Sequence, residues 1–260
     1  MNRLFDSHCH LDAAEFDADR DEVLARAHAA GVHGLLLPAT DAAGWPALRA
    51  LCAATPGLHP AYGLHPMFLA RHRREHLDLL RDWLARERPV AVGECGLDFW
   101  NGSDDAAQQL DLLDGQLRLA REFDLPVVLH ARKALDAVTA ALRRIGGLRG
   151  VVHSFSGSPQ QARALWDLGF HLGIGGPVTY PRARRLRALV ATMPARWLLL
   201  ETDSPDQPPF GSQGQRNEPA RLPQVATEVA ALRGETAASL AATTTANACR
   251  LFGLPVPDQA

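Results

Sequence analysis

The segment Trp197-Leu198-Leu199-Leu200 is a continuous apolar run, and the acidic residues Glu201 and Asp203 follow it closely. A second run of this kind, Leu35-Leu36-Leu37, lies far upstream. Apolar runs without polar alternation are typical of parallel strands that are buried on both faces. The two segments therefore favour a parallel sheet that is covered by helices.

Similar short segments rich in Val, Leu and Ile recur along the chain and alternate with longer amphipathic stretches. The candidate strands run from Leu4 to His8, His33 to Pro38, His59 to Gly63, Val90 to Glu94, Pro126 to His130, Gly150 to His153, Phe170 to Ile174 and Trp197 to Glu201. The clearest helical patterns run from Arg20 to Ala30, Ala106 to Phe123, Arg182 to Val190, Ala220 to Arg233 and Glu235 to Phe252. Eight strands alternating with helices predict a TIM (β/α)8 barrel that fills one domain over residues 1–260. An open doubly wound sheet is the alternative, but it usually brings a glycine-rich first turn, which is absent here.

Composition limits the possible partners and the compartment. The 260 residues carry a net charge of −2, so any nucleic-acid partner must be held by a local patch or by metal ions. The four cysteines lack the spacing of a zinc ribbon or a secreted disulfide framework. No leader-like segment opens the chain, and no apolar run approaches membrane-spanning length. We expect a cytoplasmic protein without membrane contact, and nothing in the sequence implies an obligate protein partner.

Residue types that bind metals fall repeatedly at the C-terminal ends of the predicted strands, where TIM barrels build their active sites. These residues are His8, His10, Glu94, His130, His153 and Asp203. Since His8 and His10 are two residues apart, strand alternation places both on one face and Cys9 on the other. A single histidine at a strand end is more often structural, but six residues of metal-binding types at matching strand ends predict a common site.

The predicted site has the composition of a centre for two divalent metal ions. His8 and His10 can chelate one ion, and Glu94 can bridge it to a second ion held by His130 and His153. Asp203 completes this set. Four imidazoles and two carboxylates suit Zn²⁺ or Mn²⁺, whereas a pure Mg²⁺ or Ca²⁺ site would need more oxygen ligands.

Two further residues face the predicted site. His65, after the third strand, can hold a substrate oxyanion or a leaving group, or it can have a structural role in its loop. Arg132, two residues beyond His130, can grip a phosphate with two parallel hydrogen bonds or pair with a neighbouring carboxylate. The remaining histidines lie near strand starts or in helices, where we interpret them as structural: His28, His33, His59, His72, His76 and His171.

Several segments resemble the TatD family of metal-dependent deoxyribonucleases. They are Asp6-Ser7-His8-Cys9-His10-Leu11-Asp12, Gly63-Leu64-His65-Pro66, Gly93-Glu94-Cys95-Gly96-Leu97-Asp98, the strand of His130, His153-Ser154-Phe155-Ser156-Gly157 and Leu200-Glu201-Thr202-Asp203-Ser204-Pro205. The order and spacing cover essentially the whole chain, and the segment from Gly175 to Arg182 looks most like the YjjV branch. Many members have cysteine where this chain has Ser154, a difference that should not affect metal binding.

This resemblance implies an amidohydrolase-type TIM barrel with the same six ligands and with a nucleic acid, most simply DNA, as substrate. It implies two divalent ions (Zn²⁺, Mn²⁺ or Mg²⁺) and hydrolysis of phosphodiester bonds, typically by a 3′–5′ exonuclease. In the mechanism that we expect, Glu94 bridges the ions and Asp203 accepts the proton of the attacking water. His65, Arg132 and Arg216 are expected to orient the phosphate.

Other activities remain open at this level. A cyclic amidase or lactonase of the same superfamily often bridges its metals with a carboxylated lysine at the end of strand four. Here Glu94 stands at that place, and Lys133, the one lysine of the chain, follows strand five. Hydrolysis of a small phosphodiester or of a carboxyl ester, such as an aminoacyl ester on RNA, is still possible. The non-enzymatic alternative is a barrel that only binds metal or nucleic acid, supported by the arginine-rich stretches from Arg71 to Arg74 and from Arg182 to Arg187.

Overall fold

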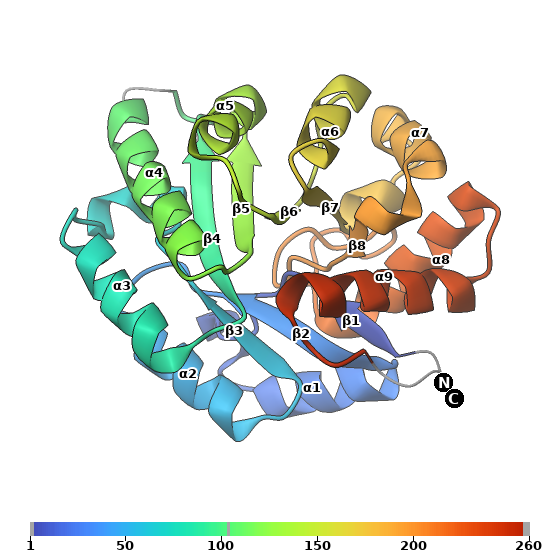
Figure 1. Cartoon of the computed structure of the whole chain (residues 1–260). Coiled ribbons are helices and arrows are strands. Elements are labelled where there is room, and N and C mark those ends of the chain that lie inside the picture. The colour runs from blue at the N-terminus through green and yellow to red at the C-terminus, as the bar shows by residue number, and fades with distance from the viewer. Residues whose placement is uncertain (1–2, 103–104, 257–260) are drawn as a thin grey trace.

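The computed structural model describes residues 3–102 and 105–256, and within them eight parallel strands form one sheet in sequence order (Figure 1). The strands are β1 (Leu4–Asp6), β2 (Val32–Pro38), β3 (Leu58–Tyr62), β4 (Ala91–Asp98), β5 (Val127–Arg132), β6 (Gly150–Val152), β7 (Phe170–Ile174) and β8 (Leu198–Leu200). Each strand overlaps the segment predicted for it. The largest difference is β4, which continues four residues beyond the predicted end at Glu94.

Hydrogen bonds at the C-terminal ends of β1 and β8 join the first strand of the sheet to the last. Ser7 N–H donates to the Leu200 carbonyl over 2.9 Å, and Asp203 N–H donates to the His8 carbonyl over 2.9 Å. Further on, His10 N–H donates to the Ser204 carbonyl over 2.8 Å. The sheet is therefore a nearly closed barrel, and the predicted TIM-barrel class is confirmed.

Helices follow the strands and cover the outside of the sheet (Figure 1). They are α1 (Arg20–Ala29), α2 (Trp45–Ala54), α3 (His76–Glu87), α4 (Ala106–Glu122), α5 (Leu135–Ile145), α6 (Pro159–Trp166), α7 (Arg184–Thr192), α8 (Leu222–Arg233) and α9 (Ala237–Phe252). The five helices predicted from the sequence are all present, with ends shifted by up to two residues. No helix of the described ranges has both the length and the apolarity that a membrane crossing requires.

The apolar run in β2 contributes to two separate parts of the core. Leu35 and Leu37 point outward and pack in the large cluster between sheet and helices, whereas Leu36 points into the barrel. Inside the barrel Leu36 meets apolar side chains of the other strands, which explains why this strand shows no polar alternation.

Helix α9 packs across the N-terminal end of the barrel. Its residue Phe252 stacks on Phe5 of β1 with the ring centroids 6.0 Å apart. Asn247 Nδ2 donates to the carbonyl of Leu198, the first residue of β8, over 3.0 Å. Thr245 Oγ1 donates to the Arg3 carbonyl just before β1 over 2.9 Å. Helix α9 therefore closes the N-terminal end of the barrel. The opposite, C-terminal end holds buried polar side chains, among them His8, Glu94 and His153.

Candidate metal centre

The six residues predicted as metal ligands meet at the C-terminal end of the barrel, with the carboxylate of Glu94 at their centre. One carboxylate oxygen, Oε2, lies 3.1 Å from His8 Nε2 and 3.4 Å from His10 Nε2. The two imidazole nitrogens are themselves 3.1 Å apart. Cys9, between them, points away toward Ser204 Oγ at 3.1 Å, as the alternation predicted. Glu94 Oε2 and this histidine pair thus form one half of the cluster.

The second oxygen of Glu94 faces another pair of histidines. Oε1 lies 2.9 Å from His153 Nε2 and 3.2 Å from His130 Nδ1. These two nitrogens are 3.1 Å apart, the same separation as in the first pair. Glu94 therefore presents a different oxygen to each histidine pair, which is the arrangement expected of a carboxylate between two cations.

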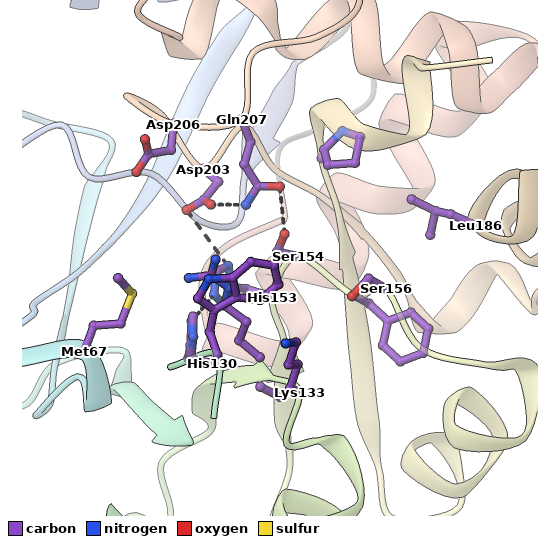
Figure 2. A pocket seen from close by; sticks show the side chains of 16 residues that line it. Met67, His130, Lys133, His153, Ser154, Ser156, Leu186, Asp203, Asp206 and Gln207 are labelled. Atoms are coloured by element: carbon purple, nitrogen blue, oxygen red, sulfur yellow. Dashed lines mark hydrogen bonds and ion pairs between the residues drawn. The ribbon is translucent and has the colours of Figure 1, made fainter. Parts of the chain in front are cut away.

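Asp203 closes the cluster from the segment after β8. Its Oδ1 lies 3.5 Å from His8 Nε2 and 3.9 Å from His153 Nδ1. Its other oxygen, Oδ2, accepts a hydrogen bond from Gln207 Nε2, and Gln207 Oε1 in turn accepts one from Ser154 Oγ over 2.9 Å (Figure 2). Gln207 and Ser154 thereby orient the Asp203 carboxylate so that Oδ1 points at the histidines.

Glu94 reaches the centre through an irregularity in β4. We predicted this residue at the end of its strand, but it lies in the middle, where the register with β5 shifts between Val92 and Cys95. Gly93 has a φ of 151°, and a Cβ on it would lie 2.7 Å from the Val128 carbonyl oxygen. Only glycine suits this backbone conformation, so Gly93 allows the bulge that turns Glu94 inward.

Asp98, which the sequence reasoning did not assign, orients His130. Its Oδ2 lies 2.8 Å from His130 Nε2, and a carboxylate beside an imidazole nitrogen requires that nitrogen to carry the proton. The lone pair of neutral His130 is then on Nδ1, which faces Glu94 and His153. Carboxylates fix metal-binding histidines in this way in many metal sites.

His65 also enters the cluster, with Nε2 3.0 Å from Glu94 Oε1. Its Nδ1, however, accepts a hydrogen bond from Met67 N–H over 3.1 Å. Neutral His65 therefore carries its proton on Nε2 and donates it toward Glu94. This tautomer has no lone pair facing the centre, so His65 is placed as a hydrogen-bond donor rather than as a ligand.

Two more buried carboxylates, those of Asp6 and Glu201, hold the backbone segments next to the centre. Asp6 Oδ1 accepts from Thr202 N–H over 2.9 Å, and its Oδ2 accepts from Thr202 Oγ1 over 2.6 Å, which ties the end of β1 to the segment after β8. Glu201 Oε1 accepts from Ser154 N–H over 2.5 Å and lies 4.0 Å from His153 Nδ1. Burial raises the pKa of Asp6 to about 7 and that of Glu201 to about 8.

The Glu94 carboxylate dominates the electrostatics of the centre. Burial opposes its ionisation, but attraction by His65, His153 and His8 outweighs burial and holds the pKa of Glu94 well below its usual range. Burial likewise opposes protonation of His153, yet the charge of Glu94 raises the pKa of this histidine to about 10. Burial and the neighbouring His153 lower the pKa of His8 to about 4. A buried negative charge therefore draws positive charge into the cluster, as protons or as metal ions.

The cluster fits divalent metal ions. Two ligand atoms at about 2.1 Å from a tetrahedral Zn²⁺ lie roughly 3.4 Å apart, close to the nitrogen–nitrogen and nitrogen–oxygen separations given above. Glu94 Oε2 is fully buried and makes no hydrogen bond within the part of the chain that the structure describes. A buried carboxylate oxygen without a partner is costly unless a cation balances it.

A cavity of about 650 Å³ opens above the cluster (Figure 2). His130, His153 and Asp203 form part of its floor, and Arg132 and Lys133 line its side. A second cavity of about 310 Å³ reaches Glu94 and His65 and shares several lining residues with the first. Substrate can therefore approach the centre from the open end of the barrel.

The two predicted arginine contacts differ in their placement. Arg132 lines the cavity, with its Nη1 3.8 Å from Asp98 Oδ2, so both of the roles expected for it remain compatible with its position. Arg216 instead forms a two-bond pair with Asp19, over 2.7 and 2.6 Å, and donates to the Glu15 carbonyl over 2.6 Å. These contacts hold its guanidinium outside the cavity. They give no support to the phosphate contact expected of Arg216.

Part of what the sequence reasoning missed had a signal. Glu201 and Asp203 are two residues apart, so the alternation applied to His8 and His10 would also have placed both acids on one face. The position of Asp98 beside His130 follows from the continuation of β4 beyond Glu94, which the strand pattern did not predict. Gln207 lies in an irregular loop, where no periodicity predicts the direction of a side chain.

Comparison with known proteins shows similarity over almost the whole chain. The family model described as TatD related DNase matches residues 5–253, which include the entire cluster. The metal-dependent hydrolase YjjV of Escherichia coli K12 is 42% identical over 97% of this chain and 99% of its own. The protein named 3′-5′ ssDNA/RNA exonuclease TatD of Cronobacter sakazakii is 40% identical over 96% of this chain and 97% of its own. The crystal structure of Escherichia coli YjjV, a TatD homologue, superposes with a TM-score of 0.92 at 41% identity and covers 98% of this chain and 99% of that one.

Proposed function

The chain belongs to the TatD family of metal-dependent hydrolases, and on this basis we propose that it is a two-metal nuclease that removes nucleotides from the 3′ end of single-stranded nucleic acid. His8 and His10 would hold one divalent ion, and His130 and His153 the other. Glu94 would contact both ions, and Asp203 would contact one. The expected YjjV-like character agrees with the high identity to YjjV.

One observation carries the two-ion assignment. Glu94 directs Oε2 at one histidine pair and Oε1 at the other, and each pair has its nitrogens 3.1 Å apart. A single ion would leave one pair of buried imidazoles and one carboxylate oxygen without a cation between them. Bridging carboxylates of this kind are typical of two-metal hydrolases.

The chain's own residues can then divide the reaction between them. When bound, the divalent ions supply Lewis acidity that acidifies water and offsets charge on the scissile phosphate. Asp203 Oδ1 is oriented toward the centre and can accept the proton of the attacking water, while Gln207 holds its other oxygen. His65, with its proton on Nε2, can donate to a phosphate oxygen or to the leaving group. Arg132 can contact the phosphate from the cavity wall.

The choice of nucleic acid as substrate rests on the relatives. The TatD proteins of Cronobacter sakazakii and Klebsiella pneumoniae are named 3′-5′ ssDNA/RNA exonucleases, at 40% and 37% identity to this chain. The cavity supports this choice, because it places a tryptophan and two cationic side chains beside the proposed metal ligands.

Digestion of an end-labelled oligonucleotide tests the proposal. A 5′-labelled single-stranded DNA is incubated with the protein and Mg²⁺, Mn²⁺ or Zn²⁺, and we expect a ladder of products shortened from the 3′ end. Asp203→Asn should abolish the ladder, whereas Asp82→Asn, an exposed residue of α3, should leave it unchanged. Circular dichroism should show that the Asp203 variant still folds.

Each other outcome bears on a different part of the proposal. Full activity of Asp203→Asn would remove this residue from the mechanism. If the wild type gives no ladder with any metal, the nuclease assignment is wrong and a small phosphodiester or a carboxyl ester becomes the substrate to test. If metal analysis finds one ion per chain at saturation, the two-metal assignment is wrong.

A further inference from the structure

Trp100, Arg132 and Lys133 lie together on the wall of the large cavity. We propose that these three residues, here called the indole platform, bind an unpaired nucleotide by stacking its base on Trp100 and pairing its phosphate with the two cations. The inference rests on the proposed nuclease function and adds the means by which the enzyme selects single strands. Such a strand exposes the faces of its bases, whereas a duplex hides them.

The exposure of Trp100 is the first observation behind this proposal. Its side chain is 52% exposed, although Trp45 is buried in the core and the three other tryptophans are at most partly exposed. Exposing a large aromatic ring costs free energy, so an exposed ring in a cavity beside a polar cluster indicates a binding surface. Met67 is also exposed, at 59%, and lines the same cavity.

The backbone holds Trp100 at a fixed place relative to the metal centre. Trp100 N–H donates to Asp98 Oδ1 over 2.9 Å, and the other oxygen of Asp98 pairs with His130. Phe99 N–H donates to the Arg132 carbonyl over 2.9 Å, which continues the β4–β5 pairing up to the platform. One carboxylate thus positions both a proposed metal ligand and the base-stacking residue, so the base and the scissile phosphate would be held in register.

The two cations complete the platform. The Arg132 guanidinium lies 4.1 Å and the Lys133 ammonium 4.3 Å from the centre of the Trp100 ring. Lys133 is the one lysine among 260 residues and makes no ion pair with a carboxylate among the described ones. Its contact with the ring is a weak one at this exposed site, so an incoming phosphate can draw the ammonium off the indole and leave room for a base.

The cavity has the size and lining that a nucleotide needs. Its volume of about 650 Å³ lies within the roughly 300–1,000 Å³ of small-molecule sites. Leu186, at the start of α7, and Pro177 form an apolar wall, and Ser156 contributes a hydroxyl (Figure 2). Arg182, Arg184 and Arg185, near Leu186 in the chain, are exposed and can contact the strand as it leaves the cavity.

Binding of a defined strand tests the platform. The probe is a 5′-fluorescein, ten-nucleotide oligothymidylate, titrated by anisotropy with protein carrying Asp203→Asn so that it is not consumed. Trp100→Ala should weaken binding by about tenfold to a hundredfold, the loss typical for a removed stacking partner. Trp100→Phe should restore most of the affinity, because phenylalanine keeps a stacking face. Leu79→Ala, which removes another exposed apolar side chain, should have no effect.

A second probe separates stacking from charge. With an oligonucleotide whose last two 3′ residues lack bases, Trp100→Ala should cost less than about twofold, because no base remains to stack. Lys133→Ala should weaken both probes and reduce the salt dependence of binding by about one counterion. Arg118→Ala, on the outer face of α4, should change neither.

The outcomes distinguish this inference from the proposed function. If wild type trims the strand and Trp100→Ala binds it as tightly as the parent, the platform is wrong and the nuclease assignment stands. Equal losses on the normal and the base-free probe would also overturn stacking. If the wild-type protein neither binds nor trims the strand, the proposed function itself fails, and the platform fails with it.

Discussion

The two ends of the barrel both carry histidines, but the surroundings of these histidines differ. At the C-terminal end five imidazoles surround Glu94, and each places a ring nitrogen 2.9–3.4 Å from one of its carboxylate oxygens. At the N-terminal end His59 stacks on Phe5 with centroids 5.8 Å apart, and His171 packs edge-on against Trp197 at 5.1 Å. Burial lowers the pKa of both histidines, to about 4 in the case of His171.

A histidine therefore takes its role from its neighbours. Beside Glu94, an imidazole can hold a proton or face a metal ion with a lone pair. Against an aromatic ring, it stays neutral and serves as a flat, partly apolar packing group. The sequence placed these histidines on opposite ends of the strands, and this position alone anticipated the difference.

Glu94→Gln should produce the largest effect. The amide cannot supply a charged oxygen to each histidine pair, so the variant should bind less metal than the wild type. Turnover should fall by at least about 10³-fold. Turnover of a labelled oligonucleotide and metal content by mass spectrometry would measure this. His59→Asn, at the other end, should change turnover by less than about twofold. Comparable losses in the two variants would remove the functional distinction between the ends.

Asp98→Asn should have an intermediate effect on the metal centre. The asparagine NH₂ cannot accept the proton of His130 Nε2, so the tautomer that points a lone pair from Nδ1 into the centre is disfavoured. We expect about 10- to 100-fold weaker metal affinity, with turnover partly restored by excess metal. Isothermal titration with Zn²⁺ would measure the affinity, with Asp82→Asn as the control. Unchanged affinity would mean that Asp98 does not orient His130.

The smallest effect concerns the pH dependence of stability at the N-terminal end. Folded His171 stays neutral down to about pH 4, whereas the unfolded chain binds a proton near the ordinary pKa of 6.5. Between these values the unfolded chain binds more protons, so the free energy of unfolding falls as pH falls. Between about pH 7.5 and pH 5, the free energy of unfolding of His171→Gln should therefore fall by about 1–2 kcal/mol less than that of the wild type. Urea unfolding of wild type and variant at the two pH values would measure this. An equal fall in the free energy of unfolding of the two proteins would contradict the prediction.

The sequence predicted the barrel and the convergence of its ligand-type residues because both depend on simple periodicity. Leu35-Leu36-Leu37 is typical of a strand buried on both faces, and histidines at the C-terminal ends of the strands meet at one end of a parallel barrel. Local deviations from periodicity were not predictable in the same way. The bulge at Gly93 moved Glu94 from a strand end to a strand interior, and the continuation of β4 brought Asp98 to His130.

Side-chain direction in irregular segments was the other limit. Arg216 was expected to orient the phosphate, yet two short hydrogen bonds join its guanidinium to Asp19. Gln207 belongs to the same loop and does point at the centre. Two polar residues of one loop thus point to different places. Arg216 is held by Asp19, which is distant in sequence, whereas Gln207 bonds to the nearby Asp203 and to the distant Ser154.

The bond from Thr202 N–H to Asp6 spans 196 positions of the chain and joins the first strand to the segment after the last. During synthesis, His8 and His10 leave the ribosome long before Asp203 exists. At the usual rate of about 5–20 residues per second, this interval lasts roughly 10–40 seconds. Throughout this interval the nascent chain has His8 and His10 without Asp203, and Glu94 joins them only partway through. Hydrolytic competence therefore begins only after nearly the whole barrel has been made.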